Sequence, residues 1–463
     1  MNSFLLQSFK GGVSDFEDKG ITGSFKFGQS LDIRKTIDSL SCQQTLATEG
    51  AGIVADTVRF IVSTSLGTIY GFGSLGKIYR RTLGGTWSLL YTDSDGAITG
   101  ACEWFLNTGK VYLFWATATK LHCKELPGSD VWADVDALAG WPKTDLTTST
   151  YHTMVQAVGS LQIANEDQVA MVGYDGSYSA SALNIFKKNY AKTMLERGNY
   201  LVVGAPSKNT TSESDLIEWD TSSLAYNDRR PLKGGTVNAM IDTDLPLMQV
   251  GTDGALYYGD MGNRLPILNI PGGGYCNPSG VTNDEGLALF GIYGNSLGYN
   301  GVWSYGRKKL NQDRTLNFEY NIGTCDEIGT VAKVGSTILV SYKNGANYYV
   351  KKVDTTTKTT AYYYSLDLKA PSKLNYLPVW GPIVLTMKPL PASCQVEAYY
   401  KLDKAGSFIQ AQMEGGTTAF TTTGGQEVVF FAQEKAKIFE IEIKLTPSVN
   451  TTPEIYKVEV YFE

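Results

Sequence analysis

Short runs of strand-forming residues, each closed by glycine, recur along most of this chain. The stretch LGTIYGFGSLGKIYRRTLGGTWSLLYTD at 66–93 contains three such runs, and similar cycles begin near residues 57, 98, 152, 197, 240, 285 and 325. This spacing of about 40 to 55 residues is close to the repeat lengths of propeller proteins. Each cycle holds a few short runs divided by Gly, Asp or Asn turns, so the repeated unit is expected to be a small antiparallel sheet.

A single four-stranded sheet cannot cover both of its faces, whereas sheets stacked around an axis cover one another. The sequence therefore predicts an all-β fold in which residues 47–371 form a β-propeller of about seven blades. Six or eight blades also fit the loose repeat, and stacked β-sandwiches are the alternative architecture. In the propeller interpretation, the doubled phrase at 66–93 is a pair of adjacent strands of one blade, joined by the turn GSLG.

The last part of the chain has a different pattern. The segment LKAPSKLNYLPVWGP carries three prolines and is typical of a domain boundary. In FEIEIKL at 439–445 apolar residues alternate with charged ones, and in EIYKVEVYF Tyr456, Val458, Val460 and Phe462 are expected on one face. Such alternation indicates half-buried antiparallel strands, and residues 372–463 are predicted to form a C-terminal β-sandwich.

Residues 1–46 are polar and glycine-punctuated, with little periodicity. Two interpretations stay open for this N-terminal arm. It is either an extended segment that packs on another molecule or an ordered lead-in with one or two edge strands.

Charge and composition exclude several classes of function. The net charge is −6 and the pI about 5.3, so general nucleic-acid binding, which needs a basic surface, is not expected. The sequence has no run long and apolar enough for a membrane span and no visible secretory signal. Its six cysteines form no CxxC pair, which favours free thiols in a protein made in a reducing cytoplasm.

Two glycine motifs resemble ligand or catalytic loops but lack their context. GFGSLG at 71–76 has the spacing of a dinucleotide-binding loop, and GNSLG at 294–298 that of a nucleophile elbow around Ser296. Both motifs require a helix directly afterwards. The residues that follow each of them indicate a turn and a strand instead.

Nor do the titratable residues form a recognisable catalytic or metal-binding pattern. Only His122 and His152 could serve a triad or a zinc site, and the adjacent His122 and Cys123 should point to opposite faces of a strand. The carboxylates considered for glycosidase-like chemistry lie in turn-like contexts: Asp93, Asp95, Asp284, Glu285 and Asp326. We therefore predict no catalytic, cofactor-binding or metal-binding residues, no cofactor and no enzymatic activity.

Tyrosines are dense in NYYVKK at 347–352 and AYYYSLDLK at 361–369. Their rings could be packed strand residues, anchors of a subunit interface, or platforms for sugars.

The arm SFKGGVSDFEDKGITGSFKFGQSLDIRKTIDSLSC, the glycine- and tyrosine-rich repeats and the tail YYKLDKAGSFIQAQ…KIFEIEIKLTPSVNTTPEIYKVEVYFE together form a recognisable arrangement. It resembles the β-propeller structural proteins of tailed bacteriophages, of the tail nozzle or tail-tip type. The resemblance implies a virion protein of the tail, made in the host cytoplasm. It also implies that the partners are copies of itself in a cyclic homo-oligomer and other tail proteins.

The alternative function is a tail adhesin that binds a host receptor or surface carbohydrate through tyrosines of the blade loops or of the terminal sandwich. A structural role predicts large contacts with other subunits, whereas an adhesin predicts exposed aromatic clusters in a concave site.

Overall fold

The structure, a computed structural model, describes residues 2–14, 23–34, 38–49, 52–53, 55–127, 132–244, 246–258, 267–309, 312–369 and 377–463. Their regular elements are strands, apart from two 3-10 turns, η1 (Phe9–Gly11) and η2 (Trp132–Asp134). The predicted all-β fold class is confirmed. Among the described residues, no helix has the length and apolar character that crossing a membrane requires.

The chain divides into two compact units. The larger unit consists of residues 48–300 and 322–352, and the smaller unit of residues 1–47, 301–321 and 353–463. The three-part division predicted at 46/47 and 371/372 stays a prediction, and its second boundary lies outside the described residues.

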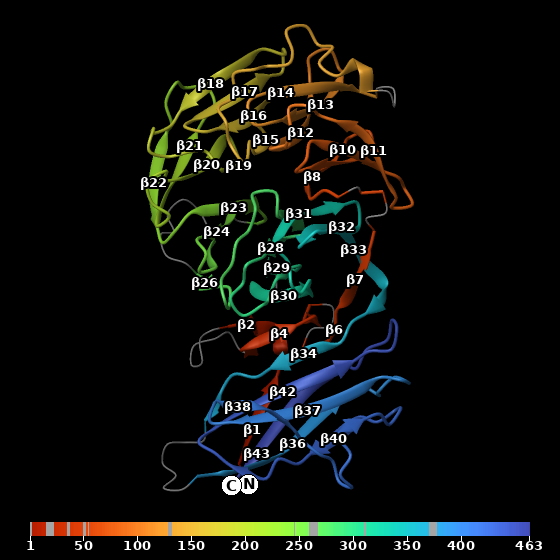
Figure 1. Cartoon of the computed structure of the whole chain (residues 1–463). Coiled ribbons are helices and arrows are strands. Elements are labelled where there is room, and N and C mark those ends of the chain that lie inside the picture. Colours follow the sequence, from red (N-terminus) through yellow and green to blue (C-terminus); the bar gives the residue numbers. More distant parts are fainter. Residues whose placement is uncertain are drawn as a thin grey trace. The chain divides into compact units, whose positions relative to one another are not determined.

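Small antiparallel sheets make up the repeated part of the chain (Figure 1). In the described part there are six sheets of four strands and one of three strands. Their strands are β8–β11 (Val58–Ser63, Ile69–Gly73, Lys77–Arg81, Trp87–Thr92), β12–β14 (Gly100–Phe105, Val111–Ala116, Leu121–Leu126), β15–β18 (Met154–Ala157, Ser160–Asn165, Gln168–Gly173, Tyr178–Asn184), β19–β22 (Thr193–Arg197, Tyr200–Pro206, Glu213–Trp219, Asp228–Lys233), β23–β26 (Val237–Asp242, Pro246–Val250, Ala255–Tyr258, Leu268–Asn269), β27–β30 (Val281–Asp284, Leu287–Ile292, Gly301–Gly306, Thr315–Asn321), and β31, β32, β33 and β7 (Glu327–Val334, Thr337–Asn344, Asn347–Lys358, Gln44–Thr48).

These sheets begin close to the cycle starts predicted from the sequence. Consecutive strands pair because tight turns return the chain on itself. At the turn GSLG, Gly76 has φ +79°, and a Cβ there would lie 2.6 Å from the carbonyl oxygen of Gly96. Only glycine fits such a position without strain. The predicted pair of adjacent strands is confirmed as β9 and β10.

Central strands of these sheets are buried on both faces. All six residues of β13 are buried. Leu113 and Trp115 pack with Phe72 of β9, whereas Phe114 packs with Leu161 of β16 in a separate cluster. Because neighbouring residues of a strand point to opposite faces, β13 must have one sheet on each side. Burial of both faces explains why such strands are hydrophobic throughout instead of alternating.

One sheet joins distant parts of the sequence. Strand β7 (Gln44–Thr48) forms the outer strand beside β33, in the order β31-β32-β33-β7. Just beyond β7, the backbone N–H of Glu49 donates to the carbonyl oxygen of Val350 over 2.8 Å.

The smaller unit contains two larger sheets. The first has five strands: β1 (Asn2–Gln7), β43 (Ile455–Phe462), β36 (Val379–Met387), β40 (Glu427–Phe430) and β41 (Glu434–Lys435). The second has seven strands: β38 (Ala405–Gln410), β37 (Gln395–Leu402), β42 (Ile438–Thr446), β34 (Ala361–Tyr364), β4 (Phe27–Gln29), β35 (Leu368–Lys369) and β39 (Ala419–Phe420). The two short ladders are β2 with β3 (Gly12–Val13, Ser24–Phe25) and β5 with β6 (Leu31–Asp32, Ser41–Cys42).

Aromatic side chains join these two sheets. Trp380 of the five-stranded sheet stacks on Phe439 of the seven-stranded sheet, with ring centroids 5.0 Å apart and an interplanar angle of 8°. The indole N–H of Trp380 donates to the carbonyl oxygen of Ala436 over 2.8 Å. Phe439, Ile441, Ile443 and Leu445 are all fully buried, as predicted for one face of this strand. On the other face Glu442 and Lys444 are partly exposed, but Glu440 is buried as well.

One prediction of alternation is wrong at a single residue. Tyr456, predicted on the buried face of its strand, is 42% exposed, and Ile455 is buried in its place. The pairing of β36 with β43 shifts register between Thr386 and Met387, where Met387 faces Ile455. Such a β-bulge reverses the alternation of side chains beyond it.

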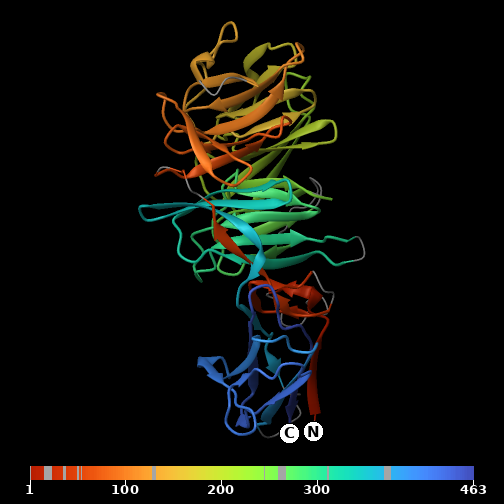
Figure 2. The ribbon, with the colours of Figure 1, turned by 90° about the vertical axis from the view of Figure 1, so that its right-hand side faces the viewer.

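The described residues of the N-terminal arm form strands within the chain. Strand β1, red in Figure 2, pairs antiparallel with β43 from Asn2 opposite Phe462 to Gln7 opposite Lys457. Strand β4 pairs with β34. Of the two interpretations of the arm, these contacts agree with the second, an ordered lead-in that contributes edge strands. Residues 15–22 and 35–37 of the arm lie outside the described residues.

A matched pair of leucine substitutions tests burial between the sheets. Leu113 is fully buried on β13, and Leu83 is fully exposed in a turn of the same unit. Leu113→Ala should lower the free energy of unfolding by about 2–5 kcal/mol, whereas Leu83→Ala should change it by less than about 0.5 kcal/mol. Urea unfolding followed by tryptophan fluorescence measures both. Equal effects of the two substitutions would contradict the sheet-on-sheet packing.

Candidate functional site

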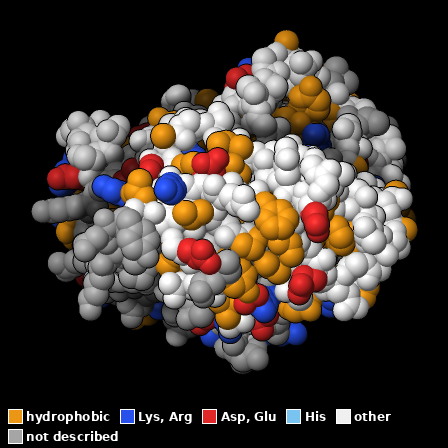
Figure 3. All heavy atoms as spheres, turned by 90° about the horizontal axis from the view of Figure 1, so that it is seen from below, with side chains coloured by type: hydrophobic (Ala, Val, Ile, Leu, Met, Phe, Trp, Pro, Cys, Tyr) orange, Lys and Arg blue, Asp and Glu red, His pale blue; other side chains and the backbone are white. Residues whose placement is uncertain are grey.

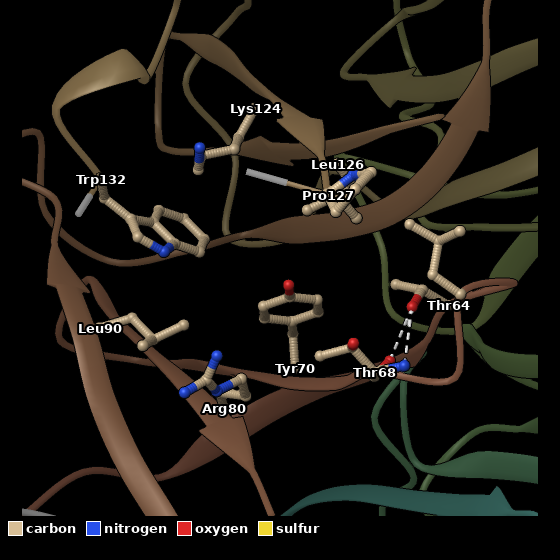
Figure 4. A pocket seen from close by; sticks show the side chains of 10 residues that line it. Thr64, Thr68, Tyr70, Arg80, Leu90, Lys124, Leu126, Pro127 and Trp132 are labelled. Carbon is tan, nitrogen blue, oxygen red and sulfur yellow. Dashed lines mark hydrogen bonds between the residues drawn. The ribbon is translucent and has the colours of Figure 1, made fainter. Parts of the chain in front are cut away.

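A pocket lies in the larger unit where the sheet β8–β11 meets the sheet β12–β14 (Figure 4). Its volume is about 250 Å³. The residues that line it are Thr64, Leu66, Thr68, Tyr70, Arg80, Leu90, Lys124, Leu126, Pro127 and Trp132. Figure 4 shows the ring of Tyr70 and the cationic side chains of Arg80 and Lys124 around the same space.

The 3-10 turn η2 supplies the aromatic wall of the pocket. Trp132 stacks on Tyr91, with ring centroids 5.7 Å apart, and meets Tyr70 edge to face at 6.2 Å. The ammonium of Lys124 lies 5.8 Å from the centroid of the Trp132 ring. A cation over an indole face is attracted by the ring quadrupole, so the turn and strand β14 hold each other in place.

The polar groups of the pocket are positioned by hydrogen bonds. The hydroxyl of Thr64 donates to the carbonyl oxygen of Thr68 over 2.8 Å. Lys124 donates to Asp134, and this hydrogen bond holds the pKa of that carboxyl below its usual value. The described lining offers two cations, hydroxyls and aromatic faces but neither a carboxylate nor an imidazole. Such a lining suits binding of a small polar ligand better than acid–base chemistry.

A cluster of three carboxylates surrounds His122 in the same unit. Nδ1 of His122 lies 2.8 Å from Oδ2 of Asp136, and Nε2 lies 3.6 Å from Oδ2 of Asp93 and 3.4 Å from Oδ2 of Asp95. The imidazole stacks on the indole of Trp115, with centroids 5.5 Å apart and an interplanar angle of 14°. We call Asp93, Asp95, His122 and Asp136 the His122 cluster.

Local structure places the members of this cluster. Asp93 follows β11, and its Oδ1 accepts the backbone N–H of Asp95 over 2.8 Å, which forms a tight turn. Asp136 accepts the backbone N–H of Cys123 over 2.9 Å and so lies along β14. Burial acts to lower the pKa of His122, but the hydrogen bond to Asp136 and the charges of Asp93 and Asp95 raise it above its ordinary value.

The His122 cluster was not visible in the sequence, although Asp93, Asp95 and His122 were each considered separately. Asp93 and Asp95 share one turn, but His122 and Asp136 are distant from that turn in sequence, and no spacing rule connects them with it. The repeat pattern could have indicated the cluster. The turn that holds Asp93 and Asp95 follows β11, the outer strand of one sheet, and such a turn can reach β14, the outer strand of the next sheet, which holds His122. His122 and Cys123 lie on opposite faces of β14, as predicted, but both are buried because a sheet covers each face.

The second histidine has a structural environment. His152 is fully buried. Its Nε2 lies 3.0 Å from the carbonyl oxygen of Thr147, and its Nδ1 lies 2.8 Å from the hydroxyl oxygen of Thr99. Burial lowers the pKa of His152 to about 4, against a smaller opposing effect of the Thr147 carbonyl. A neutral imidazole with its proton on Nε2 satisfies both hydrogen bonds.

Both glycine motifs lie in turns between strands. GFGSLG runs from β9 through a turn into β10, and GNSLG connects β28 to β29. The hydroxyl of Ser296 donates to the carbonyl oxygen of Gly272 over 2.9 Å. Neither motif is followed by a helix, so the predicted turn-and-strand interpretation is confirmed.

The other carboxylates considered in the sequence are not gathered into a site. Asp284 and Glu285 form ion pairs with Lys333, at 2.7 Å and 3.6 Å. Asp326 accepts the backbone N–H of Gly345 over 2.7 Å in a separate turn. In the tyrosine-rich segments, Tyr363 is buried, and Tyr349 stacks on Tyr342 with centroids 4.8 Å apart.

Comparison with known proteins finds similarity to solved structures alone. No protein family and no curated protein matches this sequence. Virginiamycin B lyase from Staphylococcus aureus is similar in structure, with 14% identity, a TM-score of 0.46 and coverage of 67% of this chain and 99% of the lyase. The Swd1 β-propeller domain of Myceliophteria thermophila has 12% identity and a TM-score of 0.44, and the match covers 67% of this chain and 98% of that domain.

The state of His152 can be measured directly. Its pKa of about 4 in the fold lies below the ordinary value of 6.5, so its contribution to stability is present above pH 6.5 and is lost as the pH falls toward 4. Histidine-selective ¹⁵N NMR of the folded chain at pH 5.5 should show a neutral ring with the proton on Nε2. His122→Gln assigns the signal, since only two histidines exist. An imidazolium signal from His152 at that pH would contradict the buried arrangement.

Proposed function

We propose that this chain is a non-enzymatic structural component of a tailed-phage virion, a tail protein of the nozzle, tail-tip or hub type that assembles through its surfaces. In this proposal the seven small sheets are the blades of one β-propeller, and the two larger sheets form a C-terminal β-sandwich. Its partners are copies of itself and other tail proteins.

Three observations support the propeller. The seven sheets follow one another in sequence, central strands are buried on both faces, and β7 completes the sheet of β31–β33. A sheet built from both ends of a repeat array is a way to close a ring of blades without leaving open edges. The stack of Trp380 on Phe439 supports the sandwich, because it places the two larger sheets face to face.

The assembly role is supported most directly by the edge strand β1. It lies at one end of the five-stranded sheet, and among the described residues its other edge pairs with no strand. Its sequence, NSFLLQ, has neither charge nor proline, and its pairing with β43 runs without a bulge. Edge strands of isolated proteins normally carry one of these features to prevent association.

An unprotected edge favours a neighbour that adds a strand to the sheet. The opposite end of the same sheet is β40, so β1 of one subunit and β40 of the next could pair head to tail. Heterologous contacts of this kind generate rings when the rotation between subunits closes. Hydrophobic side chains also stand exposed among charged ones on the face seen in Figure 3, which suits contacts with further proteins.

His152 and five of the cysteines have buried environments, which supports a non-enzymatic protein. His152 hydrogen-bonds to the carbonyl oxygen of Thr147 and to the hydroxyl of Thr99. Burial raises the pKa of the Cys42, Cys102, Cys123, Cys276 and Cys325 thiols to about 12. Thiols with such pKa values are poor nucleophiles at neutral pH.

Substitution of Leu5 tests the edge-strand contact. Leu5 is 48% exposed on β1, so Leu5→Lys should leave the fold intact while a charge at the edge prevents strand addition. We expect wild type to form an oligomer by light scattering, and Leu5→Lys to be monomeric and absent from particles by quantitative mass spectrometry. Leu83→Lys, at a fully exposed position, is the matched control.

A wild-type chain that is absent from purified virus particles would remove the virion proposal. If the Leu5→Lys chain were incorporated into particles as well as wild type, only the proposed role of β1 in assembly would be disproved. Deletion of the whole arm is a poorer experiment, because residues 44–46 belong to β7.

The pocket of Figure 4 favours a second candidate, a receptor- or carbohydrate-binding adhesin. Tyr70 and Trp132 offer aromatic faces for a sugar ring, and Arg80 and Lys124 lie beside them. A glycan array probed with the full chain and with Trp132→Leu tests this function. Binding by wild type that is lost in the variant supports the adhesin, and no binding by wild type argues against it.

A further inference from the structure

We propose that Asp93, Asp95 and His122 bind one divalent transition-metal ion of the zinc class, with Asp136 orienting the histidine. The inference is independent of the proposed function. It departs from the sequence prediction of no metal-binding residues, which counted histidines and cysteines. Here carboxylates supply two of the three ligands.

The first argument is the unpaired nitrogen of His122. The residue is only 4% exposed, and Nε2 is buried without a hydrogen-bond partner among the described residues. Nδ1 lies 2.8 Å from Oδ2 of Asp136, so the ring proton belongs on Nδ1 and the lone pair of Nε2 faces Asp93 and Asp95. A histidine that donates to a carboxylate from one nitrogen and presents the other to a metal is the usual arrangement in metal sites.

The second argument is geometric. The ligand atoms of Asp93, Asp95 and His122 all lie within 4.8 Å of one another. Nε2 is 3.4 Å and 3.6 Å from the nearest oxygens of Asp95 and Asp93. Ligands about 2.0–2.2 Å from a tetrahedral zinc ion are roughly 3.4 Å apart. Neither contact is a hydrogen bond, and both have about the separation expected of two ligands that share an ion.

The third argument is charge. Three carboxylates meet around one imidazole, and the described cation in contact is Lys120, whose Nζ lies 2.7 Å from Oδ1 of Asp95. With a neutral histidine, a divalent ion would balance the remaining two negative charges. Imidazole and carboxylate together suit zinc, cobalt or manganese, whereas calcium prefers oxygen ligands alone.

The surroundings fit a site that is preformed and accessible. The indole N–H of Trp115 donates to Oδ2 of Asp93 over 2.7 Å, which fixes that carboxylate. The side chain of Asp95 is 28% exposed, so solvent can reach the cluster and supply a water ligand. A bound ion would link the turn after β11 to strand β14 and so join two neighbouring sheets.

Cobalt substitution tests the site in the full chain. The protein is treated with EDTA, dialysed and titrated with Co²⁺, then with Zn²⁺. We expect one ion per chain, visible absorption typical of a tetrahedral cobalt site that Zn²⁺ abolishes, and a higher melting temperature with Zn²⁺. Asp95→Asn and His122→Gln should lose the absorption, and Asp136→Asn should weaken binding about 10–100-fold. Asp175→Asn, in an exposed turn where Asp175 accepts the N–H of Ser177, should bind as wild type.

Two outcomes would overturn the proposal. One is a folded wild-type chain that binds no Co²⁺ or Zn²⁺ at micromolar concentration, with ¹⁵N NMR showing a proton on Nε2; the cluster would then be an imidazolium held by three carboxylates. The other is equal binding by wild type and Asp95→Asn, which would place the ion elsewhere. Asp95 is partly exposed, so its variant keeps the test decisive even if His122→Gln does not fold.

Discussion

The need to cover both faces of each small sheet governs the larger unit. Strand β13 shows the constraint most clearly, because Leu113 and Phe114, adjacent in sequence, pack into different hydrophobic clusters. A strand of this composition is stable only between two neighbouring sheets. Each sheet therefore depends on the next, and the positions of turns, pockets and polar clusters follow from where adjacent sheets meet.

Both polar features described above lie at one such meeting place, between the sheets β8–β11 and β12–β14. The rings of Trp115 and Trp132 are 5.8 Å apart. One faces the imidazole of His122, and the other faces the ammonium of Lys124. An acidic cluster and a cation-lined pocket thus share one aromatic wall. The sheet β12–β14 has three strands rather than four, and the segment with η2 and Asp136 runs along its outer strand β14.

Much of this architecture could be predicted from local patterns. Glycine turns and strand periodicity gave the starts of the sheets, and the alternation in FEIEIKL matched the burial of its strand. The prediction failed at Tyr456, where a bulge in β43 against its partner β36 changes the side that faces the core. The prediction missed the His122 cluster for a related reason, since the cluster depends on a long-range contact between His122 and the turn that holds Asp93 and Asp95. Local sequence rules predict strands well, but the register of a strand and its long-range contacts depend on the strands and sheets that pack against it.

Strand β7 has a consequence for how the protein is made. Its partner β33 is completed about three hundred residues later in the chain. At about 5–20 residues per second of synthesis, β7 waits roughly 15–60 s before its sheet can form, and β1 waits longer for β43. During this interval the uncharged strand NSFLLQ has not yet met its partner β43. The order of synthesis therefore makes β1 a segment that a cell must keep from pairing prematurely.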